Sequence, residues 1–78
     1  MKHFLVLGPG CRNCDTTAKL IQERADRTNQ PVCLEKVTDM ATILGHGVMS
    51  TPGVVLDGKL LHAGSVPTPS QIDAWLQT

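Results

Sequence analysis

The chain has 78 residues, with seven basic and seven acidic side chains that leave no formal net charge at pH 7. A chain of this length can form one small domain with a modest core. Its balanced, scattered charges exclude a basic surface for nucleic acid or for an anionic membrane, and no apolar run is long enough to cross a bilayer.

The cysteine content indicates a reducing compartment. The chain has three cysteines, an odd number with only one close pair, which argues against a secreted disulfide framework and for a redox or metal motif. The N-terminal residues lack the basic region, long apolar core and cleavage site of a signal peptide. We therefore expect a cytoplasmic protein.

The first half of the chain predicts a strand, a helix and a second strand. Residues Lys2–Leu7 are mostly apolar and prone to form a strand, as expected for a central strand that is covered on both faces. From Cys14 onward, apolar residues recur at helical spacing, namely Cys14, Ala18, Ile21 and Ala25. Residues 28–31 break this pattern, and Val32–Val37 forms the second strand. A unit of this kind pairs its two strands in parallel.

A short second helix is expected next. Thr38 is the predicted N-cap, and a short apolar stripe follows it, made of Met40, Ile43 and Leu44. Gly45 or Gly47 would end this helix.

The last third of the chain predicts a hairpin and a capped helix. Asp57-Gly58 between the runs Val54–Leu56 and Lys59–His62 indicates a tight turn and an antiparallel pair. Thr68, Pro69 and Gln71 then match a helix N-terminus with a capping box. The residues expected to face the core from this helix are Ile72, Trp75 and Leu76.

Two cysteines, Cys11 and Cys14, lie where the first strand gives way to the first helix. Backbone N–H groups of a first helical turn lack intrahelical partners and carry partial positive charge, so a thiolate at Cys11 would be stabilised there. The spacing brings Cys14 back beside Cys11, within the Cα separation that a disulfide tolerates. The pair can therefore open and close.

A metal site is the alternative interpretation of the same pair. Zinc requires four ligands, and the remaining cysteine, Cys33, lies in a strand without a paired motif, where a small buried hydrophobic residue is expected. The histidines His3, His46 and His62 are dispersed along the chain, and we expect structural or surface positions for them. We expect no metal site and no cofactor.

The predicted order of elements is β-α-β-α-β-β-α. With this order and three short motifs, the chain resembles the small thioredoxin-like, glutaredoxin-sized redox-active disulfide proteins. The resemblance covers essentially the whole chain, and the segments that carry it are 8–14 (GPGCRNC), 50–53 (STPG) and 56–59 (LDGK). It implies an α/β minimal thioredoxin fold, a four-stranded mixed sheet flanked by three helices in a single domain.

The resemblance also implies roles for individual residues. Cys11 would be the attacking thiol and Cys14 the resolving thiol. Pro52 would follow a cis peptide bond, so that the backbone of Thr51 could pair with an extended substrate. The positions assigned to substrate binding are Gly10, Arg12, Asn13, Thr51 and Pro52. The chain departs from thioredoxins at Gly10, where they carry Trp, and in the first strand, where apolar Leu5 and its neighbours replace a buried acid.

The implied activity is thiol–disulfide exchange with protein disulfides, with the protein acting as a reductant. Its expected partners are protein disulfide substrates and a separate disulfide reductase as electron donor, and it is expected to act as a monomer. Two alternatives stay open. One is a soft-metal carrier that uses both thiolates, although known carriers have a different order of elements. The other is a glutathione-dependent, glutaredoxin-like enzyme, in which Thr51-Pro52 and Gly64 would hold glutathione.

Overall fold

A computed structural model of the chain describes residues 2–10 and 12–77. Its sheet has four strands, β1 (Lys2–Leu7), β2 (Val32–Val37), β3 (Gly53–Leu56) and β4 (Lys59–Ala63), in the spatial order β2-β1-β3-β4. β1 pairs in parallel with β2 and antiparallel with β3, and β3 pairs antiparallel with β4. Three helices, α1 (Arg12–Arg27), α2 (Met40–Gly45) and α3 (Pro69–Leu76), flank the sheet. This arrangement confirms the predicted α/β fold class, and β1 is the central strand that its apolar sequence predicted.

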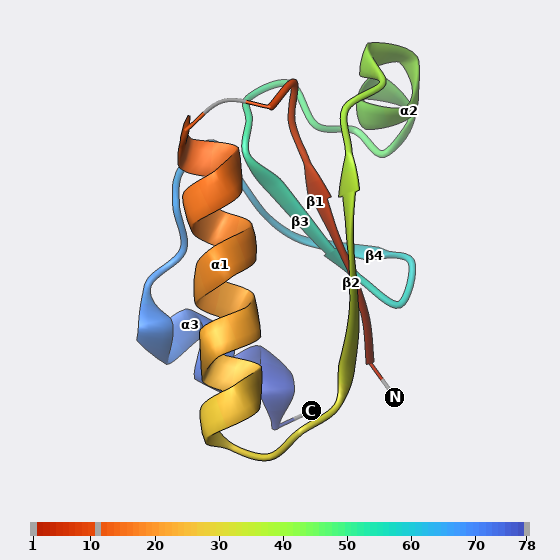
Figure 1. Cartoon of the computed structure of the whole chain (residues 1–78). Helices are drawn as coiled ribbons and strands as arrows, with labels where there is room; N and C mark the ends of the chain where they lie inside the picture. The colour runs from red at the N-terminus through yellow and green to blue at the C-terminus, as the bar shows by residue number, and fades with distance from the viewer. Residues whose placement is uncertain (1, 11, 78) are drawn as a thin grey trace.

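The two faces of the sheet are covered unequally. Figure 1 shows α1 and α3 together along one face, whereas the short α2 lies at one end of the other face. Alternate residues of β1 pack against opposite faces of the sheet, because successive side chains along a strand point to opposite faces. Phe4 and Val6 pack with α1 and α3, and Leu7 packs with Ile43 of α2. The larger core cluster therefore lies under α1 and α3.

Helix α1 begins at Arg12, between the two cysteines as expected, and its apolar repeat begins two residues later at Cys14. Its first two residues, Arg12 and Asn13, are exposed, so they contribute nothing to an apolar repeat. The buried residues of the helix lie on the side that the repeat predicted, and they are Cys14, Thr17, Ala18, Ile21 and Ala25. The hydroxyl of fully buried Thr17 donates to the carbonyl of Asn13 at 2.8 Å, which satisfies its hydrogen-bonding capacity.

Two predictions about α2 were wrong. Its N-cap is Asp39 rather than Thr38, since the Asp39 carboxylate accepts hydrogen bonds from the backbone N–H of Thr42 at 3.0 Å and from its hydroxyl at 2.7 Å. These bonds favour the charged carboxylate and lower the pKa of Asp39. The apolar stripe is also not a buried stripe, because only Ile43 is buried, whereas Met40 and Leu44 are 51% and 58% exposed.

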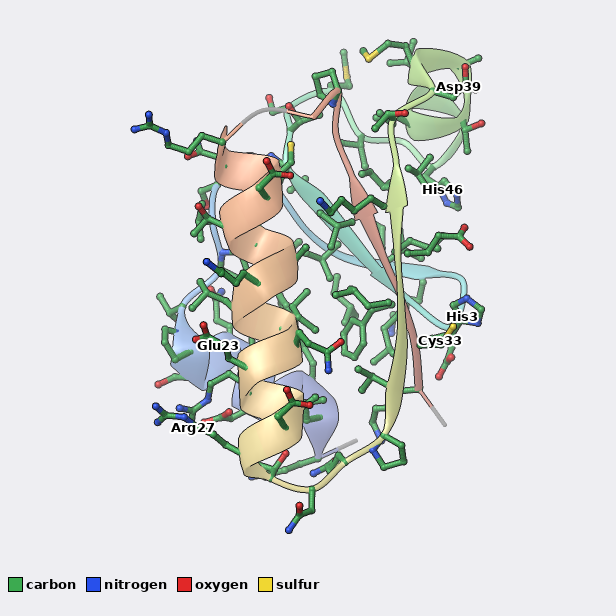
Figure 2. The ribbon with its side chains drawn as sticks, in the orientation of Figure 1. His3, Glu23, Arg27, Cys33, Asp39 and His46 are labelled. Atoms are coloured by element: carbon green, nitrogen blue, oxygen red, sulfur yellow. The ribbon has the colours of Figure 1, made fainter. Side chains whose placement is uncertain are left out.

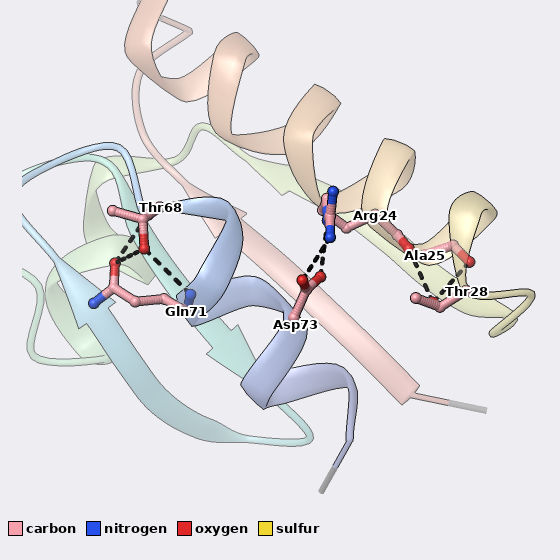
Figure 3. Close-up of polar contacts among 6 residues, drawn as sticks. All are labelled: Arg24, Ala25, Thr28, Thr68, Gln71 and Asp73. Carbon is pink, nitrogen blue, oxygen red and sulfur yellow. Dashed lines mark hydrogen bonds and ion pairs between the residues drawn. The ribbon is translucent and has the colours of Figure 1, made fainter.

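The hairpin and α3 form as predicted. Asp57 and Gly58 both take positive φ, 50° and 85°, as the turn between β3 and β4 requires. At α3, the Thr68 hydroxyl accepts from the backbone N–H of Gln71 at 3.2 Å, and the Gln71 side chain accepts from the Thr68 N–H at 2.9 Å, which completes the capping box (Figure 3). Among the residues of α3 predicted to face the core, Ile72 and Leu76 are buried and Trp75 is half-buried.

An ion pair joins α1 to α3. Arg24 Nε donates to Asp73 Oδ1 at 2.8 Å and a second guanidinium nitrogen contacts Oδ2, so the contact is bidentate (Figure 3). The two side chains are 26% and 30% exposed. The hydrogen bonds from Arg24 lower the pKa of Asp73, and the same bonds raise the pKa of Arg24. The pair therefore stabilises the packing of the two helices while both groups are charged.

No helix within 2–10 and 12–77 combines the length and apolar character that a membrane crossing needs.

Candidate functional site

The predicted site lies where β1 leads into α1. The segment Gly8–Gly10 turns the chain from the end of the strand to the start of the helix, and Gly10 has a φ of +91° that most other residues would disfavour. Cys11, the predicted attacking thiol, lies outside the described residues. Cys14 lies in the first turn of α1, and its side chain is only 3% exposed.

Gly8 lies directly against the sulfur of Cys14. A Cβ atom built on Gly8 would stand 2.0 Å from Cys14 Sγ and 3.2 Å from Cys14 Cβ. The same position is 3.6 Å from Cβ of Thr51. The Cys14 thiol and the Thr51 side chain therefore both border the space that a side chain on Gly8 would enter, so the structure brings Cys14 and Thr51 to the same place.

The Thr51–Pro52 segment is positioned by the sheet. The next residue, Gly53, pairs with Leu7, the last residue of β1, and this pairing places the segment beside the Gly8 turn. Thr51 is half-buried and Pro52 is buried, and the peptide bond between them is cis. The carbonyl of Pro52 accepts a hydrogen bond from the N–H of Gly64 at 3.0 Å. Gly64, which the glutaredoxin-like alternative places beside glutathione, therefore contacts this segment through its backbone.

The remaining predicted substrate-binding residues are Gly10, Arg12 and Asn13, and all three are exposed. Arg12 lines a surface groove of about 780 Å³ between α1 and β2, together with Lys19, Leu34 and Lys36. In the same groove, Lys36 forms an ion pair with Asp15 at 3.1 Å. The site thus combines a buried thiol and a half-buried Thr51 with an exposed first turn of α1.

Cys33 is not buried, contrary to the prediction. It is exposed on β2, where its register partner on β1 is His3 (Figure 2). Both residues are exposed and lie well away from the first turn of α1 in Figure 2. Cys33 therefore does not belong to the site around Cys14.

The histidines lie apart from one another. In Figure 2, His3 lies on the sheet and His46 follows α2, whereas the ring of His62 contacts Trp75 with centroids 6.0 Å apart. His62 Nε2 is also 3.0 Å from the carbonyl oxygen of Ser65. Within residues 2–10 and 12–77, no three His, Cys, Asp or Glu side chains gather as ligands of a metal ion.

Gly8 is the one residue of this site that the sequence reasoning did not assign. Its signals in the sequence are its position, directly after a buried strand and three residues before Cys11, and its place in the segment 8–14 that carries the resemblance. Glycine at such a junction is also compatible with an ordinary turn, so the contact with Cys14 becomes evident only in three dimensions.

Comparisons with known proteins give one consistent result. A family model described as a thioredoxin domain matches residues 2–77. A protein named thioredoxin from Methanothermobacter thermautotrophicus is 31% identical over 72 residues, which cover 92% of this chain and 94% of that protein. A second protein named thioredoxin, from Methanocaldococcus jannaschii, is 27% identical over 73 residues, covering 94% of this chain and 84% of that protein.

Proposed function

The chain belongs to the thioredoxin family and is a thiol–disulfide oxidoreductase, and from that premise we propose that it reduces protein disulfides through Cys11 and Cys14. One observation carries the proposal. The sulfur of Cys14 is held in the first turn of α1, against Gly8 and next to Thr51, at the helix start where a cysteine pair was predicted to react.

The burial of Cys14 assigns different steps of the reaction to the two thiols. An external disulfide cannot reach a side chain that is 3% exposed, so the first attack falls to Cys11. Cys11 immediately precedes α1 in the sequence, where unpaired backbone N–H groups and the helix dipole favour a thiolate. Cys14 then acts only within the complex, as the resolving thiol.

The exchange takes two steps. In the first, the Cys11 thiolate attacks one sulfur of the partner disulfide, a Cys11–partner disulfide forms, and the other partner sulfur leaves as a thiolate that takes a proton from solvent. In the second, Cys14 gives its proton to solvent and attacks the Cys11 sulfur, which forms the Cys11–Cys14 disulfide and releases the second partner thiolate. Two electrons have moved from the cysteine pair to the partner.

The site suggests how a partner is held. Half-buried Thr51 has a backbone that an extended partner segment could pair with, a mode of binding that tolerates different side chains. Gly10 directly precedes Cys11, and Arg12 and Asn13 lie between the two cysteines. All three are exposed and would contact the same partner. We further infer a single-domain, monomeric, cytoplasmic protein that needs no cofactor and receives its electrons from a separate disulfide reductase.

A disulfide-reduction assay with insulin as substrate tests this function. With dithiothreitol as electron donor, we expect turnover by the natural chain, none by Cys11→Ser, and a trapped mixed disulfide with Cys14→Ser. Cys33→Ser is the matched control, since Cys33 is exposed away from the site, and it should retain full turnover. Full turnover by either of the first two variants would contradict the scheme. Turnover that requires glutathione as donor would favour the glutaredoxin-like alternative.

A further inference from the structure

We propose that Gly8 is a positioning residue for the resolving thiol: its missing side chain leaves the space that the Cys14 sulfur occupies. The inference rests on the proposed role of Cys14. Its basis is the position of a Cβ on Gly8, which would stand 2.0 Å from Cys14 Sγ. No pair of nonbonded carbon and sulfur atoms tolerates such a separation, so a side chain at residue 8 and the present position of the sulfur exclude one another.

Backbone conformation does not explain the glycine at this position. Gly8 is absent from the glycines with positive φ among the described residues, so its backbone is open to any L-residue. The main restriction comes from the neighbouring sulfur. A Cβ on Gly8 would also be tight against Cys14 Cβ at 3.2 Å, whereas Thr51 Cβ at 3.6 Å is at an ordinary contact distance. Glycine is therefore required at residue 8 because the Cys14 side chain leaves no room for a Cβ atom there.

Neither side of the contact can move away freely. The N–H of Gly8 donates to the carbonyl of Val37, the last residue of β2, at 2.9 Å, which fixes the end of β1 to the sheet. On the other side, Cys14 belongs to the buried face of α1 and to the larger core cluster. A methyl group on residue 8 would therefore be accommodated mainly by rotation of the Cys14 side chain, which moves Sγ.

Moving Sγ affects the closing step of the reaction. In that step the deprotonated Cys14 sulfur attacks Cys11, the Cys11–Cys14 bond forms, and the partner thiolate leaves and takes a proton from solvent. Closure of a disulfide depends on the separation and direction of the two sulfurs. A displaced sulfur strains the closed bond, which lowers the equilibrium constant for closure, and displacement by about 1 Å can also cost up to roughly 100-fold in rate. Gly8 thus keeps the resolving thiol where it can close the pair.

The first test compares Gly8→Ala with the natural chain by equilibration with reduced and oxidised glutathione. We expect the equilibrium constant for forming the internal disulfide to fall at least roughly tenfold, equivalent to about 30 mV, with accumulation of the Cys11–glutathione mixed disulfide. Gly45→Ala is the matched control, because a Cβ at that glycine meets no atom within 4 Å. Thr68→Ala controls for general loss of stability away from the site. An unchanged constant in Gly8→Ala, or an equal fall in Thr68→Ala, would overturn the proposal.

The second test needs no redox activity, so it separates this inference from the proposed function. Thermal unfolding of the reduced proteins is measured for Gly8→Ala, Cys14→Ala and the double variant. Overpacking should lower the Tm of Gly8→Ala by roughly 5–15 °C, and removal of the sulfur should relieve most of that loss in the double variant. If Gly8→Ala fails to fold while the double variant folds, the steric conflict with the sulfur is established. An equal loss in both backgrounds, or failure of both to fold, would refute it.

Discussion

The burial of Ile43 makes a quantitative prediction about α2. Ile43 is the only buried residue of this helix and is fully buried against Leu7, Val48 and Val55. Replacing it by alanine removes three buried carbon atoms, which loses roughly 2.4 kcal/mol of transfer free energy at about 0.8 kcal/mol per carbon. The cavity left behind adds to this, so we expect Ile43→Ala to lower the free energy of unfolding by about 3–4 kcal/mol. A chain of this length has only about 4–12 kcal/mol in total.

The neighbouring residue provides the control for this prediction. Leu44 lies in the same helix and is 58% exposed, so Leu44→Ala should change the free energy of unfolding by no more than about 0.5 kcal/mol. Urea denaturation measures both variants, and an unchanged dependence on urea concentration would show that the same surface is exposed on unfolding. Equal losses in Ile43→Ala and Leu44→Ala would mean that α2 does not dock through Ile43, and the reasoning would fail.

Three further predictions concern a cap, an ion pair and a turn. Thr68→Ala removes the capping box of α3 and should cost about 1 kcal/mol by urea denaturation, whereas a cost near zero would mean the box contributes nothing. Because Asp73 has a lowered pKa in the folded chain, its stabilisation is present above its unfolded pKa of about 3.9 and is lost as pH falls through the folded pKa. Asp73→Asn should therefore be less stable than the natural chain at pH 7, and the difference should shrink toward pH 2; a difference that stays constant with pH would contradict this. Gly58→Ala places a side chain at a φ of +85° and should lower stability by about 1 kcal/mol in thermal unfolding, and an unchanged Tm would contradict the turn geometry.

The features predicted correctly from the sequence are local ones. The capping box at Thr68 and the Asp57-Gly58 turn each depend on residues within three positions of one another, so their chemistry can be recognised without knowledge of the rest of the chain. The central position of β1 also follows from its own composition, since the apolar run 4–7 is typical of a strand that is covered on both faces. These elements fix the order from which the fold class was predicted.

The wrong predictions concern which surfaces are covered. Cys33 lies in apolar surroundings in the sequence, yet it is exposed, because the six-residue α2 covers only one end of its face of the sheet. Leu44 is exposed on α2 itself, where Ile43 is the buried residue. The length and placement of a covering helix are properties of the assembled fold. The N-cap was misplaced by one residue for a smaller reason: threonine and aspartate both cap helices, and in the structure the Asp39 carboxylate caps α2.

The sequence predicted that the candidate site lies where β1 leads into α1, but it did not predict which side chains are in contact there. The position of Cys14 at the start of α1 followed from the change from strand to helix periodicity. The approach of Gly8 to its sulfur did not, because residues six positions apart across a turn can adopt many separations. Thr51 was expected beside the cysteine pair only because of the resemblance, and in the structure the pairing of Leu7 with Gly53 brings it there.

The two adjacent valines of β3 have a consequence for how reliably the Thr51–Pro52 segment is placed. Val54 packs into the cluster under α1 and α3, and Val55 packs into the cluster under α2, so both layers hold the same short strand. A slip of β3 by one residue would exchange these two side chains between the layers and would be opposed by both at once. Deleting a single residue between Pro52 and Asp57 would impose that exchange, so a change of length there should be far more damaging than replacing Val54 or Val55 by an apolar residue of similar size.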